Sequence, residues 1–236
     1  MPPALIRQAR DLGIDAYRSY GLSEHPTVSG RAGQPDAVCI HTDGIVHRLA
    51  EVRIVDPANP QRTLGPGEEG EILTRGPDQS CGYLREIDRA ATWIDGWLLT
   101  GDLGTLSAGG ALSVTGRKKD IIIRKGENIS AREIEDLLLE HPAIANAAVV
   151  GLPDAERGEM VCCVVVIRRA TPPTLQELCR HLLQQGLAAF KQPERLVVLP
   201  ELPCNPGGKV VKHELRALLA GTPASRPVPT SPETLP

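Results

Sequence analysis

Apolar residues recur along this chain with two spacings, which separate helical from extended segments. The first pattern predicts a helix over residues 3–12, ending at Gly13. Its apolar face consists of Leu5, Ile6, Ala9 and Leu12. Short β-rich runs then predict strands at residues 14–20, 38–39, 50–55 and 71–74. A turn rich in Pro and Gly is expected at residues 56–70. The first half is therefore predicted to be a small β subdomain.

The pattern changes near residue 119, where β-rich runs begin to alternate with amphipathic segments. Two predicted helices open with a capping box, at Ser130 with Glu133 and at Thr174 with Glu177. Strands are predicted at 121–123, 144–150, 161–167 and 196–199, and helices from 130, over 174–185 and over 210–219. The fold class is therefore α+β.

These patterns predict two domains and a tail. Residues 1–118 form the β-rich part, and residues 119–221 form a compact α+β domain that starts in the basic run Arg117-Lys118-Lys119. Residues 222–236 contain five prolines and few apolar residues, so we expect a disordered tail.

Composition narrows the functional classes. The net charge is −3 and acidic and basic residues are interspersed, which gives no case for nucleic acid as a partner. No apolar run approaches the roughly 20 residues of a membrane span, and no signal-peptide pattern opens the chain, so a cytoplasmic location is expected. The six cysteines form no CxxC pair, and Cys162 and Cys163 are expected to be buried apolar residues.

The string Tyr20-Gly21-Leu22-Ser23-Glu24 combines three groups that suit a nucleotide. An aromatic face can stack on a purine, a hydroxyl can donate to phosphate, and a carboxylate can hold Mg²⁺. Taken alone, the same string is more typical of a surface turn with an exposed acid.

Three charged residues in glycine-containing turns are further candidates. Asp102 could accept from both hydroxyls of a ribose, or it could be a local turn cap. Arg117 suits phosphate or ribose oxygens, or it could be solvated. Lys209 follows two glycines, but Pro203 and Val210 exclude a P-loop, which leaves a solvated lysine as the alternative.

The loop Lys125-Gly126-Glu127-Asn128 follows the strand predicted at 121–123. Gly126 can let a ligand approach the backbone closely, or the loop can be an ordinary turn before the helix at residue 130.

In this order and spacing, Tyr20 to Glu24, Leu99 to Leu103, Gly116 to Asp120 and Pro206 to Lys209 resemble the adenylate-forming enzymes, above all the acyl-CoA synthetases. The resemblance covers residues 3–219. It corresponds to the end of a large AMP-binding domain followed by a mobile C-terminal domain. It implies a ligase that uses ATP, Mg²⁺ and coenzyme A to convert a small or medium carboxylic acid through acyl-AMP to a thioester.

The resemblance also implies a role for each candidate residue. Tyr20 stacks on adenine, Ser23 contacts phosphate and Glu24 coordinates the metal. Asp102 binds ribose and Arg117 contacts the nucleotide. In the second domain, Lys119 is the hinge, Lys125 and Gly126 line the pantetheine path, and Lys209 is the catalytic lysine of adenylation. Lys125 departs from the family pattern, which has glycine at that position.

The family's phosphate loop and most of its acyl pocket have no counterpart among the 236 residues. We therefore expect a piece of a roughly twofold longer enzyme, with a missing N-terminal half as a possible partner. Two alternatives remain open. The chain could belong to an adenylation unit that loads a carrier protein, or it could be a non-catalytic remnant or complementing half that binds nucleotide weakly.

Overall fold

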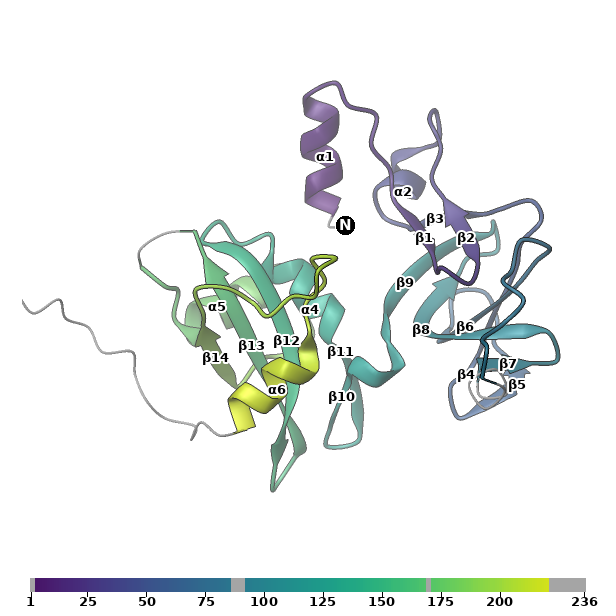
Figure 1. Cartoon of the computed structure of the whole chain (residues 1–236). Helices are drawn as coiled ribbons and strands as arrows, with labels where there is room; N and C mark the ends of the chain where they lie inside the picture. The colour runs from purple at the N-terminus through teal and green to yellow at the C-terminus, as the bar shows by residue number, and fades with distance from the viewer. Residues whose placement is uncertain (1–2, 86–91, 169–170, 221–236) are drawn as a thin grey trace, which may run out of the picture. The chain divides into compact units, whose positions relative to one another are not determined.

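The computed structural model describes residues 3–85, 92–168 and 171–220, and it confirms the predicted α+β class. The chain divides into two compact units (Figure 1). Unit 1 contains the residues up to Ile121 together with Ser130–Asp136, and unit 2 contains Ile122–Ile129 and the residues from Leu137 onward. The tail predicted at residues 222–236 lies outside the described residues. Among those residues, no helix is long and apolar enough to cross a membrane.

Unit 1 is built on a nine-stranded sheet with the order β1-β2-β3-β9-β8-β6-β4-β5, and β7 pairs with β8. Its strands are β1 (Ser19–Gly21), β2 (Pro26–Ser29), β3 (Gly44–Val46), β4 (Glu51–Asp56), β5 (Asn59–Thr63), β6 (Glu69–Arg75), β7 (Trp93–Ile94), β8 (Trp97–Leu106) and β9 (Ala111–Arg117). The helices α1 (Pro3–Asp11) and α2 (Asp36–Cys39) belong to the same unit. The 3₁₀ turn η1 (Lys118–Asp120) follows β9.

The core of unit 1 follows from strand alternation. Leu112 and Val114, two residues apart on β9, point to the same face and are buried. They join Val28, Ile54 and Ile72 from three other strands in one apolar cluster. Burying these side chains holds together strands that are as many as 86 residues apart in sequence, which is what brings distant motifs to one sheet.

Unit 2 contains a five-stranded sheet with the order β11-β10-β13-β12, in which β14 pairs parallel with β13. Its strands are β10 (Ile121–Arg124), β11 (Glu127–Ser130), β12 (Ile144–Asp154), β13 (Gly158–Ile167) and β14 (Arg195–Val198). The helices are α4 (Ala131–Leu138), which the unit boundary divides, α5 (Leu175–Gln184) and α6 (Lys212–Ala220), and η2 (Ala189–Lys191) is a 3₁₀ turn.

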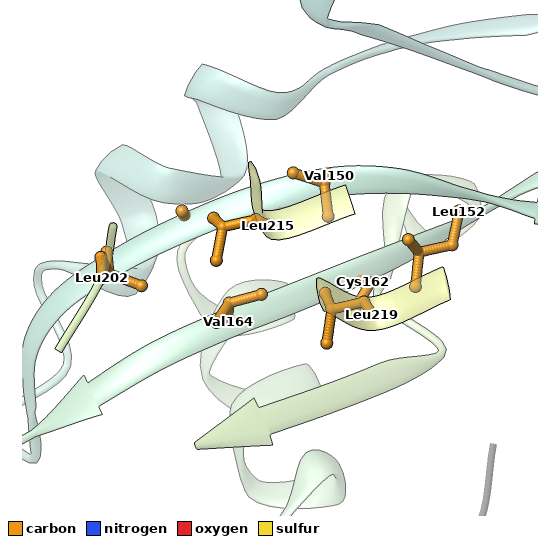
Figure 2. Packing of buried hydrophobic residues seen from close by; sticks show 8 residues of the cluster. Val150, Leu152, Cys162, Val164, Leu202, Leu215 and Leu219 are labelled. Carbon is orange, nitrogen blue, oxygen red and sulfur yellow. The ribbon is translucent and has the colours of Figure 1, made fainter. Parts of the chain in front are cut away.

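One apolar cluster of unit 2 lies between α6 and the β12–β13 pair. Figure 2 shows Leu215 and Leu219 of α6 over apolar side chains of both strands, including Val164. Cys162 and Cys163 are fully buried, as predicted. Burial raises the pKa of the Cys162 thiol to about 11, so it stays uncharged in this core.

The capping box predicted at the start of α5 is confirmed. Thr174 accepts from the Glu177 amide at 3.2 Å, and the Glu177 carboxylate accepts from the Thr174 amide at 2.7 Å. At the start of α4, Ser130 Oγ accepts from the Glu133 amide at 3.3 Å.

Three predictions for unit 1 are wrong in part. Residues 38–39 are helical, because Pro35 fixes an N-terminal backbone angle and its carbonyl accepts from the amides of Val38 and Cys39. The strand expected at 14–20 is limited to β1, where Ser19 first pairs with Ser29. The turn expected at 56–70 contains a further strand, β5.

The tip between β10 and β11 is a two-residue turn in which both residues have positive φ. Lys125 has φ +52° and Gly126 has φ +84°, the combination that a tight hairpin of the I′ class requires. Glycine adopts this conformation without strain, whereas a lysine side chain meets its own backbone there. Lys125 is thus held in an unfavourable conformation by the hairpin.

We predict that Lys125→Gly stabilises the protein by about 1 kcal/mol, because glycine removes the strain of positive φ. Lys125→Ala is the matched control, since it removes the same side chain but keeps a Cβ in the strained position. Urea unfolding of the two variants measures the difference. Equal changes in unfolding free energy would show that the conformation at Lys125 carries no strain.

A second prediction concerns His141, whose ring stands edge-on to His181 with centroids 4.9 Å apart. Burial, followed by the positive charge of His181, lowers the pKa of His141, and Glu177 opposes the shift. Because the unfolded chain then binds the proton more readily than the folded chain, stability is complete above the ordinary histidine pKa of about 6.5 and is lost as pH falls below it.

The loss of unfolding free energy between pH 7 and pH 5.5 should therefore be smaller in His141→Asn than in the wild type. Asparagine is suitable because its oxygen can still accept from the Ala143 amide, as Nδ1 of His141 does at 3.2 Å. His213→Asn, at an exposed position on α6, is the control. Identical pH slopes for wild type and His141→Asn, followed by circular dichroism, would refute the assignment.

Candidate functional site

Three residues that the sequence predicts to bind nucleotide lie in contact in unit 1, with the carboxylate of one of them at the centre. Asp102 on β8 and Arg117 on β9 are cross-strand partners, and Arg117 Nε lies 2.8 Å from Asp102 Oδ1. Tyr20 arrives from β1, 82 residues earlier, and its hydroxyl donates to Asp102 Oδ2 at 2.8 Å. One oxygen of the Asp102 carboxylate therefore accepts a hydrogen bond from Tyr20, and the other forms an ion pair with Arg117.

The side chains of this cluster differ in their exposure to solvent. The Asp102 residue is only 3% exposed, whereas the Arg117 side chain is 50% exposed. Burial, followed by the charge of Asp102, raises the pKa of the Tyr20 hydroxyl, which remains protonated and able to donate. A carboxylate oxygen has two acceptor positions, so each oxygen of Asp102 can still accept one hydroxyl.

The neighbouring motif residues fix the carboxylate in place. The Asp102 amide donates to Thr100 Oγ1 at 3.1 Å, and the Thr100 hydroxyl donates to the Ile72 carbonyl on β6 at 2.7 Å. Thr100 belongs to the motif that pointed to Asp102, but its anchoring role was not anticipated.

Ser23 and Glu24 form the tip of a tight turn between β1 and β2. Leu22 and His25 exchange backbone hydrogen bonds of 3.0 and 3.2 Å on either side of them. The turn leaves Ser23 exposed and Glu24 half-buried. Two side chains of different chemistry are thus presented side by side.

Contacts from a later segment hold Glu24. The Tyr83 hydroxyl donates to Glu24 Oε1 at 2.5 Å, and the Ser80 amide donates to the Glu24 carbonyl at 2.7 Å. With Oε1 engaged, Oε2 is the oxygen suited to Mg²⁺, which proteins commonly bind through one or two carboxylates together with substrate phosphates. Glu24 is therefore suited to bind a metal ion through one oxygen. The Gly82-Tyr83 pair is the sequence signal that would have indicated this contact.

His25, the neighbour of Glu24, is fully buried. Its Nδ1 lies 2.6 Å from Thr74 Oγ1 and its Nε2 lies 2.9 Å from Asp78 Oδ1. Both ring nitrogens are engaged by side chains of unit 1, so the role of His25 is structural.

Lys119 lies exposed in η1, beside an anchored neighbour. Lys118 Nζ lies 2.9 Å from Glu71 Oε2 and donates to the Pro57 carbonyl at 2.7 Å. Glu71 is itself buried. The chain is therefore fixed to unit 1 immediately before Lys119.

The remaining predicted residues belong to unit 2. Lys125 and Gly126 form the exposed tip of the β10–β11 hairpin. Lys209 is exposed beside the bridge between Cys204 and Val210, in a loop closed by two hydrogen bonds of 2.9 Å between Asn205 and Lys209. This loop presents the Lys209 side chain to solvent while fixing its backbone.

Comparisons with known proteins agree with this layout. The model of the family "AMP-binding enzyme" matches residues 1–84, and that of the "AMP-binding enzyme C-terminal domain" matches residues 133–209. Together the two matches cover more than half of the 236 residues.

Two relatives with similar sequences are named as ligases. A medium-chain fatty-acid–CoA ligase of Escherichia coli (strain K12) is 39% identical over 92% of this chain and 38% of its own length. A salicyl-AMP ligase/salicyl-S-ArCP synthetase of Mycobacterium tuberculosis is 44% identical over 89% of this chain and 37% of its own length. The chain thus spans well under half the length of these relatives.

Solved structures show the same fold. ATP-bound MatB from Rhodopseudomonas palustris matches 93% of this chain and 44% of its own, with a TM-score of 0.84 and 28% identity. The o-succinylbenzoate coenzyme A synthetase of Bacillus subtilis, in complex with ATP and magnesium, matches 91% of this chain and 44% of its own, with a TM-score of 0.80 and 33% identity. With both family models matched in order, the chain belongs to the AMP-binding family of adenylate-forming enzymes.

Proposed function

We propose that this chain is the nucleotide-contacting and mobile part of an ATP-dependent carboxylic acid–CoA ligase that works through acyl-AMP. The observation that carries the proposal is the Asp102 carboxylate, buried and held between Tyr20 and Arg117 with acceptor positions to spare. A fixed, desolvated carboxylate of this kind suits two adjacent hydroxyls, the feature that a ribose offers.

In this proposal the residues of unit 1 bind and orient ATP. Asp102 accepts from the ribose hydroxyls, the ring of Tyr20 lies against adenine, and Arg117 contributes positive charge at the nucleotide. Ser23 donates to phosphate from the tip of its turn. Glu24 would hold Mg²⁺, which when bound would offset negative charge on the phosphates. The carboxylic acid substrate then attacks the α-phosphate, and pyrophosphate leaves.

The residues of unit 2 act in turn. Lys209 offers a mobile ammonium that stabilises the charge developing at the α-phosphate during adenylation. We propose that the boundary between the domains lies at Lys119, where rotation withdraws Lys209 and brings in the Gly126 hairpin. The CoA thiol then attacks the acyl carbonyl and AMP leaves. Dividing the reaction in this way lets one nucleotide site serve two different transition states.

The E. coli relative, a CoA ligase for medium-chain fatty acids, supports coenzyme A as the acceptor and a small or medium acid as the substrate. The M. tuberculosis relative, a salicyl-S-ArCP synthetase, supports a second candidate function, the loading of a carrier protein. The thiol that accepts the acyl group in an assay distinguishes them.

The test combines this chain with the part of the E. coli ligase that it does not match, using a medium-chain fatty acid, ATP and CoA. The chain alone, without a phosphate loop, should form no acyl-AMP. In the combined enzyme, Lys209→Ala should abolish most pyrophosphate exchange yet still convert supplied acyl-AMP to thioester. Lys119→Pro should favour one of the two half-reactions, because proline fixes φ where the hinge must rotate.

Gly126→Leu should have the opposite effect to Lys209→Ala, slowing thioester formation while leaving pyrophosphate exchange unchanged. Gly126→Ala shares the strain at φ +84° but lacks the branched side chain, so it controls for the backbone. Acyl-AMP formation by the chain alone, above its Lys209→Ala background, would contradict the need for a phosphate loop. Equal slowing of both half-reactions by Lys209→Ala and Gly126→Leu would contradict the roles of these two residues.

A further inference from the structure

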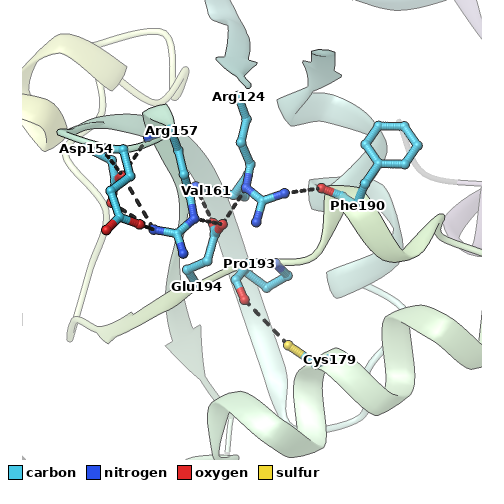
Figure 3. Close-up of polar contacts among 9 residues, drawn as sticks. Arg124, Asp154, Arg157, Val161, Cys179, Phe190, Pro193 and Glu194 are labelled. Carbon is cyan, nitrogen blue, oxygen red and sulfur yellow. Dashed lines mark hydrogen bonds and ion pairs between the residues drawn. The ribbon is translucent and has the colours of Figure 1, made fainter. Parts of the chain in front are cut away.

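Glu194, just before β14, is the meeting point of three segments of unit 2 (Figure 3). Its Oε1 accepts from Nε of Arg124, and its Oε2 accepts from the Val161 amide on β13 at 2.8 Å. The Glu194 amide also donates to the Val161 carbonyl at 3.0 Å. The carboxylate is thus fixed at both ends, which gives Arg124 a rigid acceptor.

Arg124 is the last residue of β10, two positions before Gly126. Besides Glu194, it donates through Nη1 to the Phe190 carbonyl at 2.9 Å. The Lys125 amide donates to the Arg157 carbonyl at 2.8 Å. The base of the strained hairpin is therefore tied to the rest of unit 2 by the Arg124 side chain and by the pairing of β10 with β13, where the Ile123 amide also donates to Glu159 Oε2 at 2.7 Å.

Arg157 supplies an independent observation. Its Nε is buried and has no hydrogen-bond acceptor among the described residues, yet it lies 3.9 Å from Glu194 Oε1, the oxygen that Arg124 uses. Nη1 of Arg157 is 3.4 Å from Asp154. Two guanidinium groups thus face one carboxylate, and only Arg124 has a close bond to it (Figure 3). Loss of the Glu194 charge would leave both cations without their shared partner.

We infer that Glu194 is a positioning residue for thioester formation, which acts through Arg124 to set the direction of the Gly126 hairpin. The inference rests on the proposed role of this hairpin in admitting CoA. Because hydrogen bonds between charged groups at partly buried positions are strong, one contact can restrain a tip whose own backbone is strained. Glu194 itself touches neither nucleotide nor CoA in this scheme.

Amide hydrogen exchange of the chain itself tests the restraint. Glu194→Gln should speed exchange of the Lys125 amide by about tenfold relative to wild type, the change expected when a hydrogen bond to a charged group is lost. Exchange in the centre of β12 should stay unchanged. Glu201→Gln removes the same charge at an exposed position of unit 2, outside the contacts of Arg124, Arg157 and Glu194 described above, and it should leave exchange at Lys125 unaffected.

A double-mutant comparison tests the route. If Glu194 acts through Arg124, Glu194→Gln should add nothing to exchange at Lys125 in an Arg124→Gln background. Unchanged exchange in Glu194→Gln, or equal acceleration at Lys125 and in β12, would overturn the inference. So would fully additive effects of the two substitutions.

In the combined enzyme, Glu194→Gln should slow thioester formation about tenfold and leave pyrophosphate exchange unchanged. Equal slowing of both half-reactions would overturn the positioning role. Failure of the wild-type combined enzyme to form thioester would count against the proposed function instead, and the exchange measurements on the chain would still decide whether Glu194 restrains the hairpin.

Discussion

The buried carboxylate of Asp102 is the constraint on which the candidate site depends. A charge removed from water must be met by donors, and here the donors come from strands that lie far apart in the sequence. Tyr20 can reach Asp102 only if β1 folds back along β2 and β3 to β9, and Arg117 only if β8 and β9 pair in the observed register. The contacts of the site therefore require the observed strand order, and that strand order brings the residues of the site together.

The candidate residues of unit 2 are exposed to solvent, in contrast to the buried Asp102 of unit 1. Lys209 and Gly126 lie at loop tips whose backbones are fixed by local bonds, while their side-chain positions remain open to solvent. A partly buried network around Glu194 lies at the base of the hairpin, and a strained residue, Lys125, lies at its tip. In the proposed scheme this division is useful, since unit 1 holds one nucleotide while unit 2 exchanges the groups presented to it.

Some of this layout was predictable from sequence and some was not. Apolar runs predicted β12, β13 and α5 well, because buried strands and capped helices leave strong local signals. The helix at Asp36–Cys39 was missed because Pro35 and backbone bonds, rather than apolar spacing, determine it. The candidate residues were found by resemblance, but their partners were not. Contacts such as Tyr83 with Glu24 and Arg124 with Glu194 join residues 59 and 70 positions apart, which no local pattern encodes.

Titration of the isotope-labelled chain with AMP tests the central claim most directly, because it requires neither catalysis nor a partner. The account predicts saturable chemical-shift changes centred on Tyr20, Ser23, Asp102 and Arg117, with affinity at least about tenfold weaker in Asp102→Asn, which has lost a charged acceptor. Asp95→Asn, at an exposed turn beside β8, should bind AMP as the wild type does. Shifts centred elsewhere, or equal affinity of wild type and Asp102→Asn, would contradict the account.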